Sequence, residues 1–117
     1  MKQKVINPFG GPCVGKSVVR AQSFSQMKLL GIKVEEVTEY AKDITWEGRT
    51  SLFSDQLSIL AKQNRRLQRL VGKVDWIITD SPLLMNLAYV PPDYLKNYEP
   101  LVRELWDRYD NYNILLL

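Results

Sequence analysis

Residues 9–20, "FGGPCVGKSVVR", constrain the fold of this chain more than any other stretch. They match the pattern G-x-x-x-x-G-K-[ST], whose fixed positions here are Gly10, Gly15, Lys16 and Ser17. A short apolar run at residues 4–9 precedes the glycines, and a helix-compatible stretch follows them as far as Gly31. The sequence therefore predicts a strand, a glycine-rich loop and a helix, an arrangement that cradles phosphate groups with backbone N–H groups.

This stretch, known as Walker A, has a candidate residue for each part of a phosphate site. Lys16 is expected to reach the β- and γ-phosphate oxygens, and the Ser17 hydroxyl is expected to coordinate Mg²⁺. Cys13 stands where such loops often carry glycine, and we expect it to weaken the cradle modestly. The residues expected to bind the nucleotide are Gly10, Gly11, Pro12, Cys13, Val14, Gly15, Lys16, Ser17 and Val18.

The remaining hydrophobic patterns alternate between strand and helix periods. A second strand is expected from about Lys33 to Thr38, and a buried strand within residues 74–82 is expected to end in an acidic turn at Asp80. Between them, residues 54–71 predict the clearest helix, with Ser54 positioned to cap its start. The apolar positions expected to form the stripe of this helix are Leu57, Leu60, Ala61, Leu67 and Leu70.

The last third of the chain predicts three further segments. Proline and tyrosine residues in "YVPPDYLKNYEP" (residues 89–100) indicate an irregular loop, and a helix is expected from Pro100 to about Asp110. Its predicted stripe consists of Leu101, Leu105 and Tyr109. The closing "YNILLL" predicts a strand, so the order β-α-β-α-β-α-β favours a parallel sheet covered by helices on both faces.

Pro8 lies in the first predicted strand. Because proline removes a hydrogen-bond donor and is rare inside a central strand, we expect the strand to end at Asn7.

Ligands of parallel α/β sheets bind at the carboxyl ends of the strands, where the glycine-rich loop, Glu39 and Asp80 should converge. Asp80 is expected to hold Mg²⁺ in the manner of a Walker B aspartate, with helix capping as the alternative. Glu39 is the candidate acceptor-side base, so Lys16, Glu39 and Asp80 form the expected catalytic set. Residues after Glu39 could stack a ring or bind anions, or could belong to an ordinary surface loop; they are Tyr40, Lys42, Asp43, Trp46 and Arg49.

Composition limits the function classes. The chain has 117 residues, of which 45% are hydrophobic, so we expect one nucleotide-binding domain over residues 1–117. One cysteine and no leader-like segment favour a reducing cytoplasm, and no run is long enough for a membrane span. The absence of histidine argues against a zinc or iron enzyme. A formal charge of +3 is too small to imply a nucleic-acid partner and fits an anionic substrate equally well, so nucleic acid is not the expected partner. The usual meaning of the basic residues Lys62, Arg65, Arg66 and Arg69 is a solvated helix face.

With these residues assembled, the chain resembles the P-loop ATPase/kinase family. That family includes the nicotinamide-riboside-kinase domain of the bacterial NAD regulator and similar small AAA-type phage proteins. The stretches that carry the resemblance are "GGPCVGKS", "VTEYAKDITWEGR", "DQLSILAKQNRRL", "VDWIITDSPLL" and "WDRYDNYNILLL".

The resemblance implies a three-layer α/β/α P-loop NTPase fold similar to nucleoside and nucleotide kinases, with ATP and Mg²⁺ as cofactors. It also places Gln63 near the acceptor. Members of the family continue past the strand matched by "NILLL" into an arginine-bearing lid and a further strand, which have no match here. We therefore expect the N-terminal part of a longer domain, or a reduced form whose last strand is covered by a partner chain or a second copy.

Two functions remain open at this point. The first is a kinase that transfers the γ-phosphate of ATP to a nucleoside or nucleotide-like small molecule. The second is an ATP- or GTP-binding regulatory or interaction module with weak or no hydrolysis.

Overall fold

The computed structural model describes residues 1–10, 15–38, 56–88, 90 and 93–116. The elements in chain order are β1 (Lys4–Phe9), α1 (Lys16–Leu29), β2 (Val34–Val37), α3 (Gln56–Gln68), β3 (Trp76–Thr79), the 3₁₀ helix η2 (Leu83–Ala88), α4 (Tyr98–Asp107) and β4 (Asp110–Leu115). This order confirms the predicted alternation of strands and helices. Among the described helices, none is long and apolar enough to cross a membrane.

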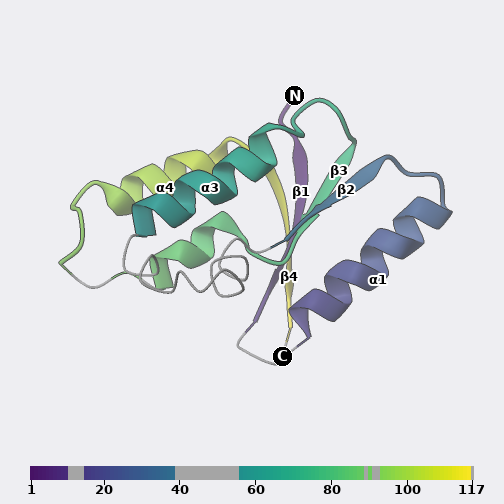
Figure 1. Ribbon diagram of the computed structural model, residues 1–117, viewed down its shortest axis with the longest axis horizontal. Helices are drawn as coiled ribbons and strands as arrows, with labels where there is room; N and C mark the ends of the chain where they lie inside the picture. The colour runs from purple at the N-terminus through teal and green to yellow at the C-terminus, as the bar shows by residue number, and fades with distance from the viewer. Residues whose placement is uncertain (11–14, 39–55, 89, 91–92, 117) are drawn as a thin grey trace.

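The four strands form one parallel sheet in the order β2-β3-β1-β4. Figure 1 shows α1 on one face of this sheet and α3, η2 and α4 on the other. The described part of the chain is therefore an α/β fold in which helices cover both faces of a parallel sheet, as predicted. α1 connects β1 to β2 across one face of the sheet, and α3 lies on the other face, between β2 and β3 in the chain. The connections on the two faces therefore involve the neighbouring strands β1 and β3.

Strand alternation divides the side chains between the two faces. Val5 and Ile77 are register partners on the α3 and α4 face, and both are buried in the main hydrophobic cluster. Ile78 lies one position further along β3 and therefore faces α1. It is fully buried, as is Val34 of β2, which also faces α1. The sheet therefore has an apolar layer on each side, as expected for a parallel sheet between helices.

Pro8 lies inside β1, so the prediction that the strand ends at Asn7 was wrong. The carbonyls of Gln3, just before β1, and of Phe9, at its end, accept hydrogen bonds from the β4 side, from Asp110 N and Leu116 N. Neighbouring residues of a strand point their backbone groups to opposite sides, so the nitrogen of Pro8 points towards β3. Pairing with β3 extends only to Ile6, whereas pairing with β4 continues to Phe9. The missing donor therefore costs no ladder hydrogen bond.

The predicted stripe of α3 was partly wrong. Leu60 and Leu67 are buried as expected, but Leu57 is 41% exposed and Ala61 is also exposed. The buried side of the helix is instead completed by Ile59 and two glutamines, Gln56 and Gln63. Sequence periodicity missed this rotation because glutamine is normally a surface residue.

The predicted stripe of α4 needs a similar correction. The helix starts at Tyr98 rather than Pro100, and its buried residues are Tyr98 and Val102, whereas Leu101 is 38% exposed. The Tyr98 hydroxyl donates to the carbonyl of Gln56 at 3.2 Å and so ties the start of α4 to the start of α3. Burial, with a smaller contribution from nearby Tyr94, raises the pKa of Tyr98 from 10.0 to about 12.

The helix η2 was not predicted. It follows the turn after β3, and its buried residues are Leu83 and Asn86. It packs against both α3 and α4, and Leu83 belongs to the main hydrophobic cluster. Among the described residues of the stretch that we expected to be an irregular loop, those from Tyr98 onward belong to α4.

Candidate functional site

The site is built around the N-terminus of α1. Gly15 occupies the N-cap position with φ 89°, a left-handed conformation that favours glycine. The carbonyl of Gly15 accepts the first intrahelical bond, from Val19 N at 2.9 Å. In an α-helix the amide groups of the first turn precede the intrahelical hydrogen bonds, and the helix dipole places partial positive charge there. A helix N-terminus of this kind can bind an anion, and the phosphate cradle expected from the glycine-rich pattern remains a prediction.

The structure brings Ser17 and Asp80 together at this end of α1. The Ser17 hydroxyl donates to Oδ2 of Asp80 at 3.3 Å, although the two residues are 63 positions apart in the chain. Asp80 directly follows β3 and is 3% exposed. Because β1 and β3 are neighbours, the helix that follows β1 starts beside the residue that follows β3. This is the part of the predicted convergence at the carboxyl ends of the strands that falls within the described residues, whereas Glu39 lies outside them.

Two further charged residues join this pair, and neither was predicted from the sequence. Arg20 donates from Nε to Oδ2 of Asp80 at 3.1 Å and from Nη1 to Oε2 of Glu36. Arg20 lies one turn after Ser17 on α1, and Glu36 lies on the α1 face of β2, in register with Ile78. The helical spacing of Ser17 and Arg20 could have suggested that both reach the same carboxylate. The contact to Glu36 required the strand order.

The donor set fits Mg²⁺ in part. Hydroxyl and carboxylate oxygens are the ligands that this hard cation prefers, and adjacent oxygens around octahedral Mg²⁺ at 2.0–2.1 Å lie about 2.9 Å apart. The 3.3 Å between Ser17 Oγ and Asp80 Oδ2 is close to that separation. Within the described residues, no group of three or more His, Cys, Asp or Glu could hold a metal. Mg²⁺ at this site would therefore complete its shell with phosphate oxygens and water, as it commonly does at nucleotide sites.

Gln63 is placed by the structure next to the turn that follows Asp80. Its side chain is 7% exposed, donates from Nε2 to Ser81 Oγ at 2.7 Å and accepts from Asn86 Nδ2 at 2.7 Å. Asn86 also donates to the carbonyl of Leu83 at 2.9 Å. Both ends of the Gln63 amide are thus used within the protein, which gives it a role in holding this turn.

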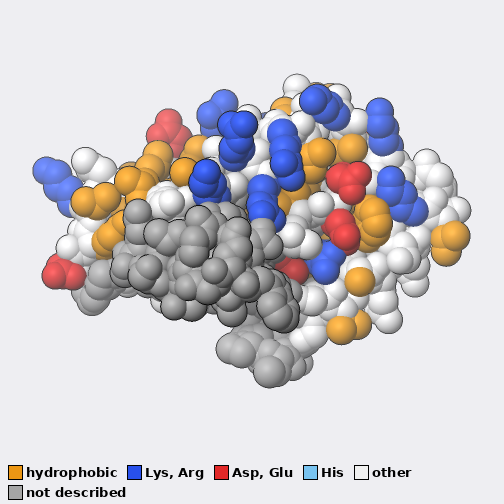
Figure 2. Space-filling model, viewed as in Figure 1, with side chains coloured by type: hydrophobic (Ala, Val, Ile, Leu, Met, Phe, Trp, Pro, Cys, Tyr) orange, Lys and Arg blue, Asp and Glu red, His pale blue; other side chains and the backbone are white. Residues whose placement is uncertain are grey.

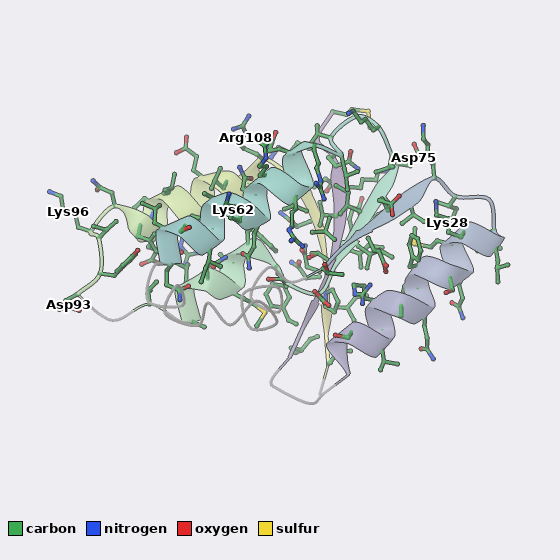
Figure 3. The ribbon with its side chains drawn as sticks, in the orientation of Figure 1. Lys28, Lys62, Asp75, Asp93, Lys96 and Arg108 are labelled. Atoms are coloured by element: carbon green, nitrogen blue, oxygen red, sulfur yellow. The ribbon has the colours of Figure 1, made fainter. Side chains whose placement is uncertain are left out.

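The basic residues of α3 lie away from the group formed by Ser17, Arg20, Glu36 and Asp80. Lys62, Arg65 and Arg69 are exposed, and Figure 2 shows Lys and Arg side chains gathered over the α3 side of the molecule. In Figure 3, Lys62 on α3 lies on the side of the sheet opposite to α1, which carries Lys28. Arg66 instead donates to Thr38 O at 3.3 Å and to Thr38 Oγ1 at 3.2 Å, and so fixes the residue after β2.

Several expected site residues lie outside the described part of the chain. They are Gly11, Pro12, Cys13 and Val14 of the glycine-rich loop, and Glu39, Tyr40, Lys42, Asp43, Trp46 and Arg49 of the expected acceptor region. The side chain of Lys16 also falls outside it, although its backbone begins α1. Gly10 directly follows β1, and the side chain of Val18 on α1 is 58% exposed. The roles expected for the undescribed residues remain predictions.

Comparisons with known proteins give a fold likeness. No protein-family model matches the chain, and no curated protein matches it. The chain is similar to the crystal structure of a protein named APE1195, with a TM-score of 0.54 and 18% sequence identity. The likeness covers 99% of this chain and 61% of that protein, so the chain spans about three fifths of its length. At this identity, the comparison supports the α/β architecture alone.

Proposed function

We propose that this protein binds Mg-ATP as a P-loop nucleotide-binding protein. The observation that carries the proposal is the pairing of Ser17 with Asp80 at the N-terminus of α1, directly after a sequence that fits the Walker A pattern. A chance glycine-rich turn would not require a buried carboxylate from a distant strand beside its serine. The likeness to APE1195 agrees with the α/β fold but has no bearing on the ligand.

Each residue of the site has a chemical role in this proposal. Backbone N–H groups at the start of α1 hold the phosphate oxygens, and Lys16 offsets the charge of the β- and γ-phosphates. Ser17 and Asp80 hold Mg²⁺, which, when bound, neutralises charge on the phosphate groups. Arg20 donates to the same oxygen of Asp80, Oδ2, as Ser17 does.

We further propose that the reaction is transfer of the γ-phosphate to a nucleoside or nucleotide-like acceptor. This step rests on the resemblance of the sequence to the nicotinamide-riboside-kinase family and on Glu39, which follows β2 by two positions. A carboxylate near the acceptor can take the proton of its hydroxyl as the oxygen attacks the γ-phosphorus. Phosphoryl transfer depends mostly on positioning and charge stabilisation, so one acceptor-side base is sufficient chemistry for the protein to supply.

The test measures nucleotide binding and ADP release with Mg²⁺ across nucleosides, nucleotides and nicotinamide riboside. Lys16→Ala should abolish both, whereas Lys28→Ala removes the same charge from the last turn of the same helix and should change neither. Glu39→Gln should retain ATP affinity and lose transfer. Equal binding by the Lys16→Ala and unmodified chains would refute the nucleotide site. Binding without acceptor-stimulated ADP would refute the kinase reaction and identify a regulatory nucleotide-binding module.

A further inference from the structure

We propose that Glu36 tunes the Mg²⁺ affinity of the site by sharing the positive charge of Arg20 and so leaving the carboxylate of Asp80 available to the metal. The inference deepens the proposed function and rests on it, because it concerns Mg²⁺ at the same carboxylate. Glu36 acts through Arg20 and Asp80, so it is a positioning residue.

The contacts of Arg20 are the first support. One guanidinium group reaches two carboxylates through different nitrogens, Nε for Asp80 and Nη1 for Glu36. Arginine stays charged at every physiological pH and binds carboxylates through its planar fork. The single positive charge is therefore divided between two negative groups that come from neighbouring strands, β2 and β3.

Burial makes this division matter for a metal. The side chains of Asp80 and Arg20 are 2% and 13% exposed, so water screens their attraction poorly, whereas Glu36 is 33% exposed. Counting Arg20 as +1 and the two carboxylates as −1 each, the cluster carries one net negative charge. If Glu36 is made neutral, the charges of Arg20 and Asp80 cancel, and a cation at Asp80 must then compete with an arginine that has no second carboxylate to bind.

Geometry also separates the effect of Glu36 from that of its neighbour in the chain. Glu35 and Glu36 are consecutive in β2, so their side chains lie on opposite faces of the sheet. Glu36 is in register with Ile78 on the α1 face, and Glu35 with Ile77 on the other face. Glu35 accepts a hydrogen bond from the backbone N of Glu36 at 3.3 Å. Glu35→Gln therefore removes an equal charge from the same strand while leaving the partners of Arg20 in place.

The experiment titrates binding of a fluorescent ATP analogue with Mg²⁺ at buffered free-metal concentrations, with an EDTA baseline for metal-free binding. Glu36→Gln should raise the Mg²⁺ concentration for half-maximal enhancement by about tenfold, the size expected for losing one partly exposed charge near a divalent cation. Glu35→Gln should leave it within about twofold, the effect of a more distant charge on the opposite face of the sheet. The double variant Arg20→Met with Glu36→Gln removes the competing cation and should return the midpoint towards that of the unmodified chain.

The possible results distinguish a failure of this inference from a failure of the proposed function. Equal midpoints for Glu36→Gln and Glu35→Gln would overturn the inference, even if the double variant fails to fold. A folded double variant that needs still more Mg²⁺ than Glu36→Gln would overturn it too, because Arg20 would then hold Asp80 in place rather than compete for it. Nucleotide binding in EDTA by every single variant is expected. If the unmodified chain bound no nucleotide either with or without metal, the proposed function and this inference would both be overturned.

Discussion

Gln63 has two candidate roles, to hold the turn after β3 or to face an acceptor, and one substitution distinguishes them. Gln63→Leu keeps a side chain of similar size but removes the hydrogen bonds to Ser81 and Asn86. The two bonds contribute about 1 kcal/mol each, and the Asn86 N–H left in a buried position costs about 1 kcal/mol more. Burial of the added apolar surface returns about 1 kcal/mol. We therefore expect a loss of about 2 kcal/mol in the free energy of unfolding.

Urea unfolding, followed by far-ultraviolet circular dichroism, measures this loss as a shift of the midpoint at an unchanged m-value. Gln68→Leu is the matched control, because Gln68 lies on the same helix but is exposed and donates one bond, to the Tyr109 hydroxyl at 2.8 Å. That bond is expected to contribute about 0.5 kcal/mol. Equal losses for the two variants would refute the argument from burial. Unchanged stability of Gln63→Leu with loss of acceptor-stimulated turnover would instead support the expectation from the family resemblance that Gln63 faces the acceptor.

Two further substitutions test the burial of Tyr98 and the backbone conformation at the start of α1. Because burial raises the pKa of Tyr98 to about 12, above the ordinary 10.0, the folded state holds the phenol proton more tightly. This contribution to stability is complete below pH 10 and is lost as the pH rises to about 12. Tyr98→Phe should flatten the alkaline fall in the urea midpoint, and an unchanged fall would contradict the assignment. Gly15→Ala should lower stability by about 1 kcal/mol, because alanine is strained at a φ of 89°. An added Cβ would meet no atom within 4 Å, so backbone strain is the only expected cause. An unchanged unfolding midpoint would show that the left-handed conformation is not needed there.

Much of the fold could be predicted because the elements are short and separated by clear turn signals. The strand expected near residues 33–38 is β2, and the acidic turn expected after the third strand places Asp80 directly after Thr79. The apolar face of α3 was harder to predict, because two of its buried positions are glutamines. Gln63 is satisfied by Ser81 and Asn86, which lie 18 and 23 positions away, so a local window contains no sign of its burial.

The candidate site was predictable to the same extent and for related reasons. The carboxyl-end rule brought Ser17 and Asp80 together without knowledge of the strand order. The link from Arg20 to Glu36 depends on more, because β2 lies beyond β3 and α1 crosses the face that carries Glu36. A sequence with correct strand and helix boundaries is still compatible with other strand orders. In several of them these two residues are far apart.

Pro8 has a consequence for how strands can be added to this sheet. A strand inserted between β1 and β3 would meet a position on β1 that cannot donate a hydrogen bond, and one of its own carbonyls would then lack a partner. On the β4 side, the same stretch of β1 pairs as far as Phe9. The proline therefore makes the two sides of β1 unequal in what they accept as a neighbour. Any strand on the β3 side must stop pairing with β1 before Pro8, as the strand that precedes Asp80 does at Ile6.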